Sequence, residues 1–521
     1  MSAFTIVTAA QLLERHHLLR EIIHNGGWTL DASDVPGADN PIAAVTYDTR
    51  TVAPGSMLFV KGRFRPEFLD GIDERGLAVY VAENDHSDRT AAPGLIVDDV
   101  HKAMSLLSAE FYGRPQDELT VIGITGTKGK TTTAYLVHAI LNDYSNQRAA
   151  LFSSEQTCLD GRTYTDSKLT TPESLDAFRM MRQAADNGMR YLVMEVSSQA
   201  YKVHRVHGLT FDIGAFLNIS PDHISPIEHP TFEDYLHCKR QLITNSKTLV
   251  VNADCNRVQL LRQDAAHAGI PVADFSVYGP DDGRKTAHAI TAVADGSDPD
   301  DFRVTIRDHD AGTFRLRLPG DCNIANAAAA MAIATAAGVP ADSPALHAVE
   351  TVTVPGRMEV LADPGTRTWA IVDYAHNFAS VAALLDFVDS RYGADRPFIT
   401  LVTGAAGNKA IDRRREIVEA AQHRIGRFVF TAEDTDTEPY EDICNDMMRH
   451  VTNPDVDARI VVDRVTALTE AIRDARSNPE RWDMVLVIGK GHERWIKDRN
   501  RHMPYEGDDK VVSRLLSEPL E

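Results

Sequence analysis

Residues 119–140, LTVIGITGTKGKTTTAYLVHAI, constrain the fold of this chain more than any other stretch. An apolar run leads into a turn rich in glycine and threonine, and apolar residues at helical spacing follow, which predicts a strand, a loop and a helix. Such loops bind phosphate because backbone N–H groups and a helix N-terminus face the same point. The spacing departs from the strict phosphate-loop template, since five residues rather than four separate Gly123 from Gly129.

The side chains of this loop suit the phosphates of ATP. Lys130 supplies a positive charge for the outer phosphates, and the Thr131 hydroxyl can bind the Mg²⁺ that accompanies ATP. The alternative is a turn without a ligand that only joins a strand to a helix. We predict that ATP is bound by Gly126, Thr127, Lys128, Gly129, Lys130, Thr131 and Thr132.

Composition limits the classes of function. With 521 residues, 43% of them hydrophobic and 25% charged, the chain is long enough for about three globular domains. The net charge of −21 disfavours binding to nucleic acid or to a membrane surface. Five cysteines without CxxC spacing favour a reducing compartment. No apolar run reaches the 18 residues of a membrane span, so we expect a cytoplasmic protein without membrane insertion.

The order of strand-like and helix-like segments predicts an α/β protein of three domains. The expected domains are residues 1–115, a central ATP-binding domain over 116–350, and a third domain over 351–521. The central domain should have a parallel sheet of the phosphate-loop ATPase type, extended by an antiparallel hairpin over 301–320. The third domain should be Rossmann-like, with a helix that buries Val381, Leu384, Leu385 and Val388.

Three polar side chains follow the loop at points where they could act. Glu195 ends the apolar strand YLVMEV, and His223 follows a second one. Lys239 lies on a predicted helix that Thr231 opens, with Asp234 as its capping-box partner. Taken singly, Glu195 is as readily a solvated strand end as a ligand, and a lone His or Lys is more often structural than functional.

Eight motifs together carry a resemblance to a known family. TGTKGKTTT, LTTPES, MEVSSQAY, NISPDH, HCKRQL, GDCNIANAAAA, VPGRMEV and DYAHN span nearly the whole chain. Their order and spacing resemble those of the Mur ligases, the ATP-dependent amide-forming enzymes of peptidoglycan precursor synthesis. MEVSSQAY and SPIEHPTFEDY are most similar to the branch that adds L-lysine to UDP-N-acetylmuramoyl-L-alanyl-D-glutamate.

The resemblance implies a reaction and a set of catalytic groups. The D-Glu γ-carboxylate attacks the γ-phosphate of ATP, and the amine then displaces phosphate from the acyl phosphate. Positioning and charge neutralisation do most of this work, so a nucleophilic Ser or Cys is not expected. The catalytic residues implied are Lys130, Glu195, His223 and Lys239. The Mg²⁺ ligands implied are Thr131, Glu195, His223 and Lys239, the last as a carbamate.

The resemblance also implies three sets of binding residues. Further ATP contacts come from Asn326, Arg357 and Asp373. The UDP-sugar peptide is contacted by Thr49, Thr170, Thr171, Ser197 and Arg205, where Thr49 replaces a serine of the family. The amino acid is contacted by Arg414, Glu433, Asp434, Thr435, Asp436, Gly489 and Glu493. The substrates are therefore a UDP-N-acetylmuramoyl dipeptide and a diamino acid, and a monomer is expected.

The nature of the added amino acid rests on FTAEDTDTEP. Members of the family that add meso-diaminopimelate have Asp-Asn-Pro-Arg there, with an arginine for the distal carboxylate. Three of residues 433–436 are acidic and none is arginine, which favours a side chain that ends in an ammonium. The alternatives are L-ornithine, which differs from lysine by one methylene, and meso-diaminopimelate. A folylpolyglutamate synthetase-like ligase and a non-catalytic ATP-binding paralogue are the more distant alternatives.

Overall fold

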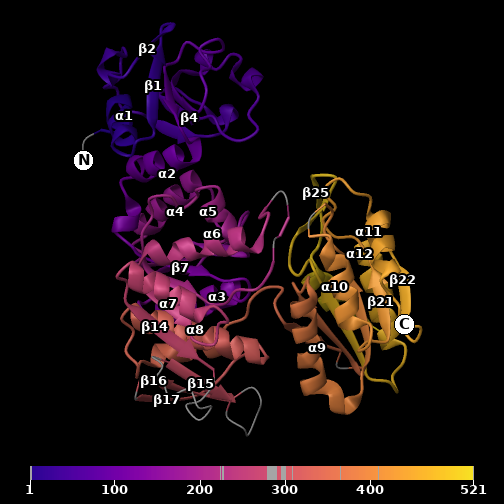
Figure 1. The fold of residues 1–521 in the computed structure, drawn as a ribbon. Helices are drawn as coiled ribbons and strands as arrows, with labels where there is room; N and C mark the ends of the chain where they lie inside the picture. Colours follow the sequence, from indigo (N-terminus) through magenta and orange to yellow (C-terminus); the bar gives the residue numbers. More distant parts are fainter. Residues whose placement is uncertain are drawn as a thin grey trace.

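The chain folds around three large sheets that follow one another along the sequence. A computed structural model describes residues 3–222, 224–225, 228–277, 290–294, 301–307, 309–363, 365–408 and 410–519. The sheets hold six, eleven and six strands, and a separate two-stranded ribbon accompanies the last. In Figure 1 the N-terminal part stacks on the end of the central part, and the C-terminal part lies beside the central part. The predicted α/β class is confirmed.

The N-terminal sheet has the order β2-β1-β6-β5-β4-β3 and is parallel from β3 to β6. Its strands are β1 (Leu19–His24), β2 (Gly27–Thr29), β3 (Ala44–Thr46), β4 (Ser56–Phe59), β5 (Leu77–Ala82) and β6 (Gly94–Val97). The apolar faces of α1 (Ile6–Arg15) and α2 (Val100–Phe111) pack on it. Short 3-10 helices are η1 (Ala32–Asp34), η2 (Thr49–Thr51), η3 (Pro66–Leu69), η4 (Asp73–Arg75) and η5 (Pro115–Asp117).

The central sheet has the order β10-β9-β8-β11-β7-β12-β13-β14-β15-β16-β17, and its strands from β8 to β15 are parallel. The strands are β7 (Thr120–Thr125), β8 (Ala149–Phe152), β9 (Gln156–Cys158), β10 (Tyr164–Asp166), β11 (Tyr191–Glu195), β12 (Phe211–Phe216), β13 (Ser246–Asn252), β14 (Val272–Ser276), β15 (Ile290–Ala294), β16 (Asp301–Ile306) and β17 (His309–Arg315). The phosphate-type loop leaves β7 in the middle of the sheet, where the carboxyl ends of parallel strands form a ligand site.

The helix after this loop, α3 (Lys130–Tyr144), is buried on almost every side. Leu136, Val137, Ile140 and Leu141 are fully buried, because the sheet covers one side of the helix and α8 (Asp321–Ala336) the other. The other helices of this part are α4 (Ser174–Asp186), α5 (Ser198–Lys202), α6 (Phe232–Thr244), α7 (Val258–His267) and η6 (Pro344–Thr351).

The predicted antiparallel hairpin is confirmed, with different strand limits. β16 and β17 pair Phe302 with Phe314 and Ile306 with His309. The second strand already includes Asp310 and Gly312, and Leu316 and Leu318 lie beyond its end. A bulge next to Val304 changes the register, which an alternating pattern alone does not reveal.

The C-terminal sheet has the order β18-β19-β23-β20-β21-β22 and is parallel except for β18. Its strands are β18 (Glu359–Ala362), β19 (Thr368–Asp373), β20 (Phe398–Thr403), β21 (Arg427–Phe430), β22 (Asp457–Ile460) and β23 (Asp483–Ile488), and β24 (Trp495–Asp498) with β25 (Arg501–Pro504) forms the ribbon. The helices are α9 (Phe378–Tyr392), η7 (Gly393–Asp395), α10 (Asp412–Ala421), α11 (Tyr440–Arg449), α12 (Arg464–Arg476) and α13 (Asp508–Ser517). The four apolar residues predicted for α9 are buried.

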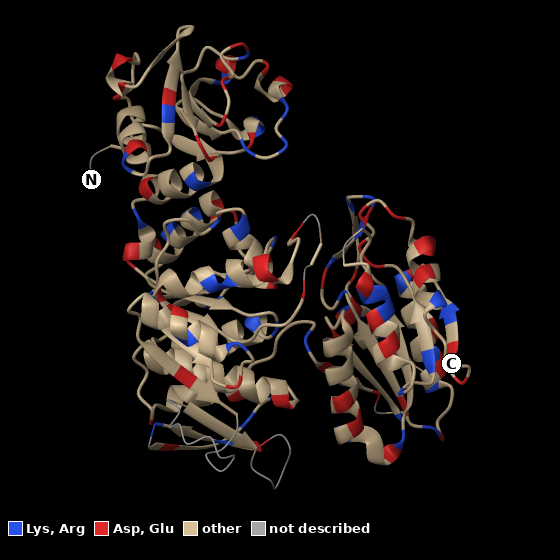
Figure 2. Cartoon of the chain, viewed as in Figure 1, with Lys and Arg blue, Asp and Glu red and all other residues tan. Residues whose placement is uncertain are grey.

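Charge is spread over the whole molecule. Figure 2 shows acidic and basic residues interspersed on the visible elements of all three parts. The chain has 75 acidic and 54 basic residues, and the surplus of acidic residues is not confined to one segment. Within the described ranges, every helix is too short or too polar to cross a bilayer.

Candidate active site

The loop between β7 and α3 curves around an ammonium group. Lys130 Nζ donates to the carbonyl oxygens of Gly126 (2.9 Å) and Thr127 (3.2 Å). Gly129, just before the helix, has a φ of 82°, and a Cβ there would collide with Asn326 Oδ1. The left-handed conformation and the close contact both require glycine. Asn326 thus lies behind the loop, where it also accepts a hydrogen bond from Thr133 Oγ1 (3.3 Å).

Gly129→Ala is expected to destabilise the protein more than a comparable glycine substitution. The left-handed backbone costs an alanine about 1–2 kcal/mol, and here displacement of Asn326 adds to that cost. Gly269→Ala is the matched control, because Gly269 has a φ of 68° and no atom within 4 Å of its Cβ position. Chemical unfolding of both variants measures the difference in free energy of unfolding. Equal losses would show that the Asn326 contact contributes nothing.

Glu195 ends β11, directly beside β7, and is fully buried. Its carboxylate accepts hydrogen bonds from Thr131 Oγ1 (3.1 Å), Ser154 N (2.7 Å) and Ser154 Oγ (3.2 Å). Burial raises the pKa of Glu195, and the charge of Lys130 opposes that shift. The carboxylate and the Thr131 hydroxyl thus form an oxygen-rich donor set next to the loop.

Lys239 reaches the same loop from α6. Its Nζ donates to Gly126 O (2.8 Å) and lies 4.8 Å from the centre of the Tyr235 ring. The side chain is almost fully buried, and burial together with the charge of Lys130 holds the pKa of Lys239 well below its usual range. Burial and the nearby charge of Lys130 thus both disfavour the ammonium form of this side chain.

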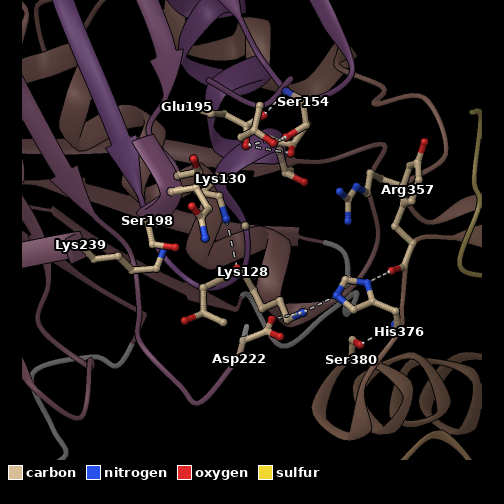
Figure 3. A pocket seen from close by; sticks show the side chains of 18 of the residues that line it. Lys128, Lys130, Ser154, Glu195, Ser198, Asp222, Lys239, Arg357, His376 and Ser380 are labelled. Atoms are coloured by element: carbon tan, nitrogen blue, oxygen red, sulfur yellow. Dashed lines mark hydrogen bonds and ion pairs between the residues drawn. The ribbon is translucent and has the colours of Figure 1, made fainter. Parts of the chain in front are cut away.

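A cavity of about 610 Å³ joins these groups to residues of the C-terminal part. Figure 3 shows Glu195, Lys130 and Lys239 on one side of it and Arg357 and His376 on the other. The predicted site residues that line it are Thr127, Lys128, Gly129, Lys130, Thr131, Thr132, Thr170, Glu195, Ser197, Arg205, Lys239, Arg357 and Asp373. Those that do not line it are Thr49, Gly126, Thr171, Asn326, Arg414, Glu433, Asp434, Thr435, Asp436, Gly489 and Glu493. His223 lies outside the described residues.

The residues predicted for the UDP-sugar peptide divide into two groups. Thr170 and Arg205 face the cavity, and Arg205 forms an ion pair with Glu173 (2.8 Å). Thr171 is fully buried instead, and its hydroxyl donates to Glu195 O (2.9 Å) and accepts from Ser197 N (3.0 Å), so it holds the strand end in place. Thr49 lies apart from the cavity, in η2 of the N-terminal part.

The C-terminal wall of the cavity is held to the central part by ion pairs. Asp222 lies 3.3 Å from Lys128 Nζ and 2.6 Å from Arg413 Nη2, and so links the two parts. Burial lowers the pKa of Lys128 to about 8, although Asp222 opposes this shift. Arg357 stacks on the Tyr374 ring at 4.4 Å. Sequence reasoning missed Asp222, although it lies beside His223 in the motif NISPDH.

Asp373 is oriented by the backbone at the end of β19. It accepts hydrogen bonds from Met358 N (2.9 Å) and Ala375 N (2.7 Å), and burial raises its pKa. Glu155 of the central part lies near this point, since it accepts a hydrogen bond from Tyr374 Oη (3.1 Å) and pairs with His492 Nδ1 (3.0 Å). The sequence contained no signal for this contact, because Glu155 belongs to none of the motifs.

The residues predicted for the amino acid gather within the C-terminal part. Asp434 accepts hydrogen bonds from Lys490 Nζ (2.9 Å) and Lys497 N (2.9 Å), and the Lys490 ammonium also contacts Glu493. Lys490 lies 4.2 Å from the centre of the Trp495 ring and is almost fully buried. Sequence reasoning missed Lys490, which partly neutralises the acidic cluster. Burial raises the pKa of Glu493 to about 7, with Lys490 opposing the shift.

The remaining members surround this cluster. Thr435 is buried and bonded to the ribbon through Lys497 O and Arg499 N, while Asp436 accepts a hydrogen bond from Asn408 Nδ2 (3.1 Å). Glu433 lies against Gly489, where a Cβ would meet its carboxylate. Arg414 is buried and paired with Glu438 (2.6 Å) and Asp446 (3.2 Å).

Comparison with known proteins identifies the family. The Mur ligase middle domain matches residues 124–334, and the Mur ligase, glutamate ligase domain matches residues 356–491. UDP-N-acetylmuramyl-tripeptide synthetase of Bifidobacterium longum (strain NCC 2705) is 60% identical over 515 residues, which cover 99% of each chain. UDP-N-acetylmuramoyl-L-alanyl-D-glutamate--L-lysine ligase of Enterococcus faecalis (strain ATCC 700802 / V583) is 39% identical over 511 residues, which cover 97% of each chain.

A solved structure of a Mur ligase has a similar fold. The structure of a UDP-N-acetylmuramoyl-L-alanyl-D-glutamate--2,6-diaminopimelate ligase aligns with a TM-score of 0.61 at 22% identity and covers 93% of this chain and 96% of its own. Both matches to family models include parts of the cavity wall, and the relatives extend over the whole chain. The chain therefore belongs to the Mur ligase family.

Proposed function

We propose that this protein is the ATP-dependent ligase that joins L-lysine to the D-Glu γ-carboxylate of UDP-N-acetylmuramoyl-L-alanyl-D-glutamate in peptidoglycan precursor synthesis. One observation carries the proposal: a single cavity is lined by the phosphate-type loop, Glu195 and Lys239 together with Arg357 and Asp373 of the C-terminal part. Relatives named tripeptide synthetase and L-lysine ligase over nearly the whole chain support the choice of substrates.

The reaction proceeds in two steps. The γ-carboxylate oxygen attacks the γ-phosphorus of ATP, so that an O–P bond forms, the bond to the β–γ bridging oxygen breaks, and ADP leaves. The lysine α-amine then attacks the acyl carbon, and inorganic phosphate leaves as the amide forms. Lys130 and the backbone of the loop hold the phosphates, and Arg357 adds positive charge from the opposite wall.

Mg²⁺ fits the oxygen donors at the loop. Among the described residues, the direct hydrogen-bond partners of the buried Glu195 carboxylate are neutral groups of Thr131 and Ser154, and both are compatible with a hard cation nearby. Thr131, Glu195 and a carbamylated Lys239 would hold the ion, with His223 as a further predicted ligand. When bound, Mg²⁺ supplies positive charge to the phosphate oxygens.

Carbamylation of Lys239 makes its position consistent with a cation site. The neutral amine adds to CO₂, a N–C bond forms, and a proton is released. The product is an anionic carbamate in place of a group that could otherwise carry a positive charge. The low pKa of Lys239 favours this reaction, because burial and Lys130 disfavour the ammonium. An unmodified ammonium at this place would repel Mg²⁺.

The choice of lysine rests on the acidic cluster in the C-terminal part. Asp434 and Glu493 share one internal cation, Lys490, so the cluster holds more acidic than basic groups, which favours the side-chain ammonium of the incoming amino acid. Arg414 is the proposed contact for its α-carboxylate. We assign the UDP-sugar to residues 1–115, ATP to 116–350 and the amino acid to 351–521.

The substrates also suggest where the protein acts and in what form. ATP and nucleotide-linked sugars are cytoplasmic metabolites, so we place the reaction in the cytoplasm. We expect a monomer, because one chain supplies both walls of the cavity. The remaining site residues, including Thr49, Thr171, Asn326 and the neighbours of Asp434, stay predictions.

Product analysis tests the proposed function. Purified protein is mixed with Mg-ATP and UDP-N-acetylmuramoyl-L-alanyl-D-glutamate, and L-lysine, L-ornithine and meso-diaminopimelate are offered separately. Mass spectrometry should detect the lysine adduct. An adduct with one of the other two amino acids alone would keep the ligase and refute the assignment of residues 433–436. Absence of any adduct would favour a folate ligase or a non-catalytic ATP-binding protein.

Asp434→Asn is expected to weaken lysine binding selectively. A hydrogen bond to a charged group contributes about 1.5–3 kcal/mol, so the KM for L-lysine should rise by roughly 10- to 150-fold, while the KM for ATP stays within about twofold. Asparagine keeps an acceptor for Lys497 N, which preserves the local fold. Asp442→Asn on the exposed face of α11 is the control. Equal increases in both KM values would refute the role of Asp434.

A further inference from the structure

A hydrogen-bonded group of polar side chains reaches the cavity wall through Ser198. Ser198 lies at the start of α5 and lines the cavity together with Lys239, and both are labelled in Figure 3. His229 Nε2 lies 2.9 Å from Ser198 Oγ, and His229 Nδ1 lies 2.7 Å from Asp234 Oδ2. The His229 side chain is fully buried. None of the three was among the predicted site residues.

The partners of Asp234 fix the direction of these hydrogen bonds. Lys202 Nζ lies 2.8 Å from both carboxylate oxygens, and its hydrogen bond holds the pKa of Asp234 below its usual range. Because an ionised carboxylate only accepts, Nδ1 of a neutral His229 must carry the proton. Nε2 then accepts the Ser198 hydroxyl proton, which leaves the lone pairs of Ser198 Oγ as hydrogen-bond acceptors.

Cys238 lies near His229 and Asp234, so the group also resembles a metal site. The Lys202 ammonium already occupies both oxygens of Asp234, and both ring nitrogens of His229 are engaged. A divalent cation would have to displace these contacts. The arrangement instead has the order acceptor, imidazole, hydroxyl that transfers protons in enzymes with a Ser-His-Asp relay.

We propose that Ser198, His229 and Asp234 form a proton relay that deprotonates the incoming amino acid, an inference that rests on the proposed ligase function. The α-ammonium donates a hydrogen bond to Ser198 Oγ. Its N–H bond breaks with the electron pair left on nitrogen, the proton joins Ser198 Oγ, and the original hydroxyl proton moves to His229 Nε2. The positive charge thus passes from the ammonium to the imidazolium, which Asp234 stabilises.

Ser198 is the residue that touches the substrate in this scheme. His229 orients the Ser198 hydroxyl and takes up its proton, and Asp234 orients His229 and stabilises the imidazolium. The ligase needs such a step because an ammonium has no lone pair with which to attack the acyl phosphate. Ser198 lines the same cavity as Lys130, Glu195 and Lys239, which puts the relay at the wall of the proposed reaction site.

A nucleophile that is already uncharged does not need the relay, so it distinguishes a proton relay from a purely structural role of Ser198 and His229. Hydroxylamine is uncharged at neutral pH and traps acyl phosphates as hydroxamates. Ser198→Ala and His229→Gln should each lower kcat with L-lysine on the order of 100-fold, the usual contribution of general-base catalysis. Hydroxamate formation from Mg-ATP, UDP-N-acetylmuramoyl-L-alanyl-D-glutamate and hydroxylamine should stay within about threefold of the wild-type rate. Ser390→Ala, at an exposed position of α9, is the control.

The outcomes distinguish the relay from the proposed function. Equal losses with lysine and hydroxylamine, or no loss with lysine, would overturn the relay and leave the ligase intact. Failure of the wild-type protein to release ADP with this substrate would overturn the proposed function and the relay with it. A selective loss with lysine in both variants supports the relay, and the retained hydroxamate rate shows that the variants are folded.

Discussion

Lys239→Ala is expected to lower kcat for ligation by about 100- to 1000-fold while the protein stays folded. The substitution removes the side chain that we propose to carry the carbamate, and a lost charge-stabilising group in a buried site costs factors of about 100 to 1000. Short carboxylates such as formate and acetate can enter the space left behind and supply an anionic oxygen. The kcat of the variant should therefore rise with their concentration, as measured by ADP release coupled to product formation.

The control for this experiment is Lys247→Ala, an exposed lysine on the strand that follows α6. Its kcat should match the wild-type value, and added formate should leave it unchanged. Mass spectrometry of the intact wild-type protein in bicarbonate tests for the carbamate directly. Wild-type turnover of Lys239→Ala would refute the carbamate hypothesis. A slow variant that no carboxylate rescues would instead assign Lys239 a role as a buried hydrogen-bond donor to Gly126.

Lys130→Met should abolish the first step of the reaction. The methionine side chain has a similar length but no charge, so the loop loses the cation that faces the phosphates. Lys130 is half-buried in the loop, and a charged contact with phosphate contributes on the order of 1000-fold to phosphoryl transfer. ADP release should fall with L-lysine and with hydroxylamine alike, since both depend on the acyl phosphate.

This shared loss distinguishes Lys130 from the relay, for which only the lysine rate should fall. Lys510→Met, at an exposed position of α13, is the matched control and should keep both rates. Nucleotide binding by calorimetry completes the test, because Lys130→Met should also weaken ATP binding. Full activity of the variant would show that the loop backbone alone neutralises the phosphates.

The sequence predicted the α/β class, the strand, loop and helix of residues 119–140 and the buried face of α9, and the structure confirms them. These features depend on local patterns: apolar runs form strands, i, i+3, i+4 spacing forms helices, and a glycine is needed where φ is positive. The limits of β17 were not predictable, because a bulge shifts the register without a signal in the alternating pattern.

The helix that carries Lys239 shows where local rules end. Thr231 opens it as predicted, since its hydroxyl accepts a hydrogen bond from Asp234 N (3.2 Å). The capping box is only half formed, because the Asp234 carboxylate turns to His229 and Lys202 instead of the backbone of Thr231. Lys202 lies 32 positions earlier in the chain, and such a competing partner is visible only after folding.

The sequence by itself determined the family, the order of the elements and the identity of the chemical groups. Tertiary structure alone decided which groups meet: Asp222 with Arg413, Glu155 with His492, Lys490 between Asp434 and Glu493, and Ser198 with His229. The physical reason is the sequence separation over which each effect acts. Propensity and periodicity act over a few residues, whereas a cavity wall, a lowered pKa and a proton path require low solvent exposure and partners that the fold brings together from distant segments.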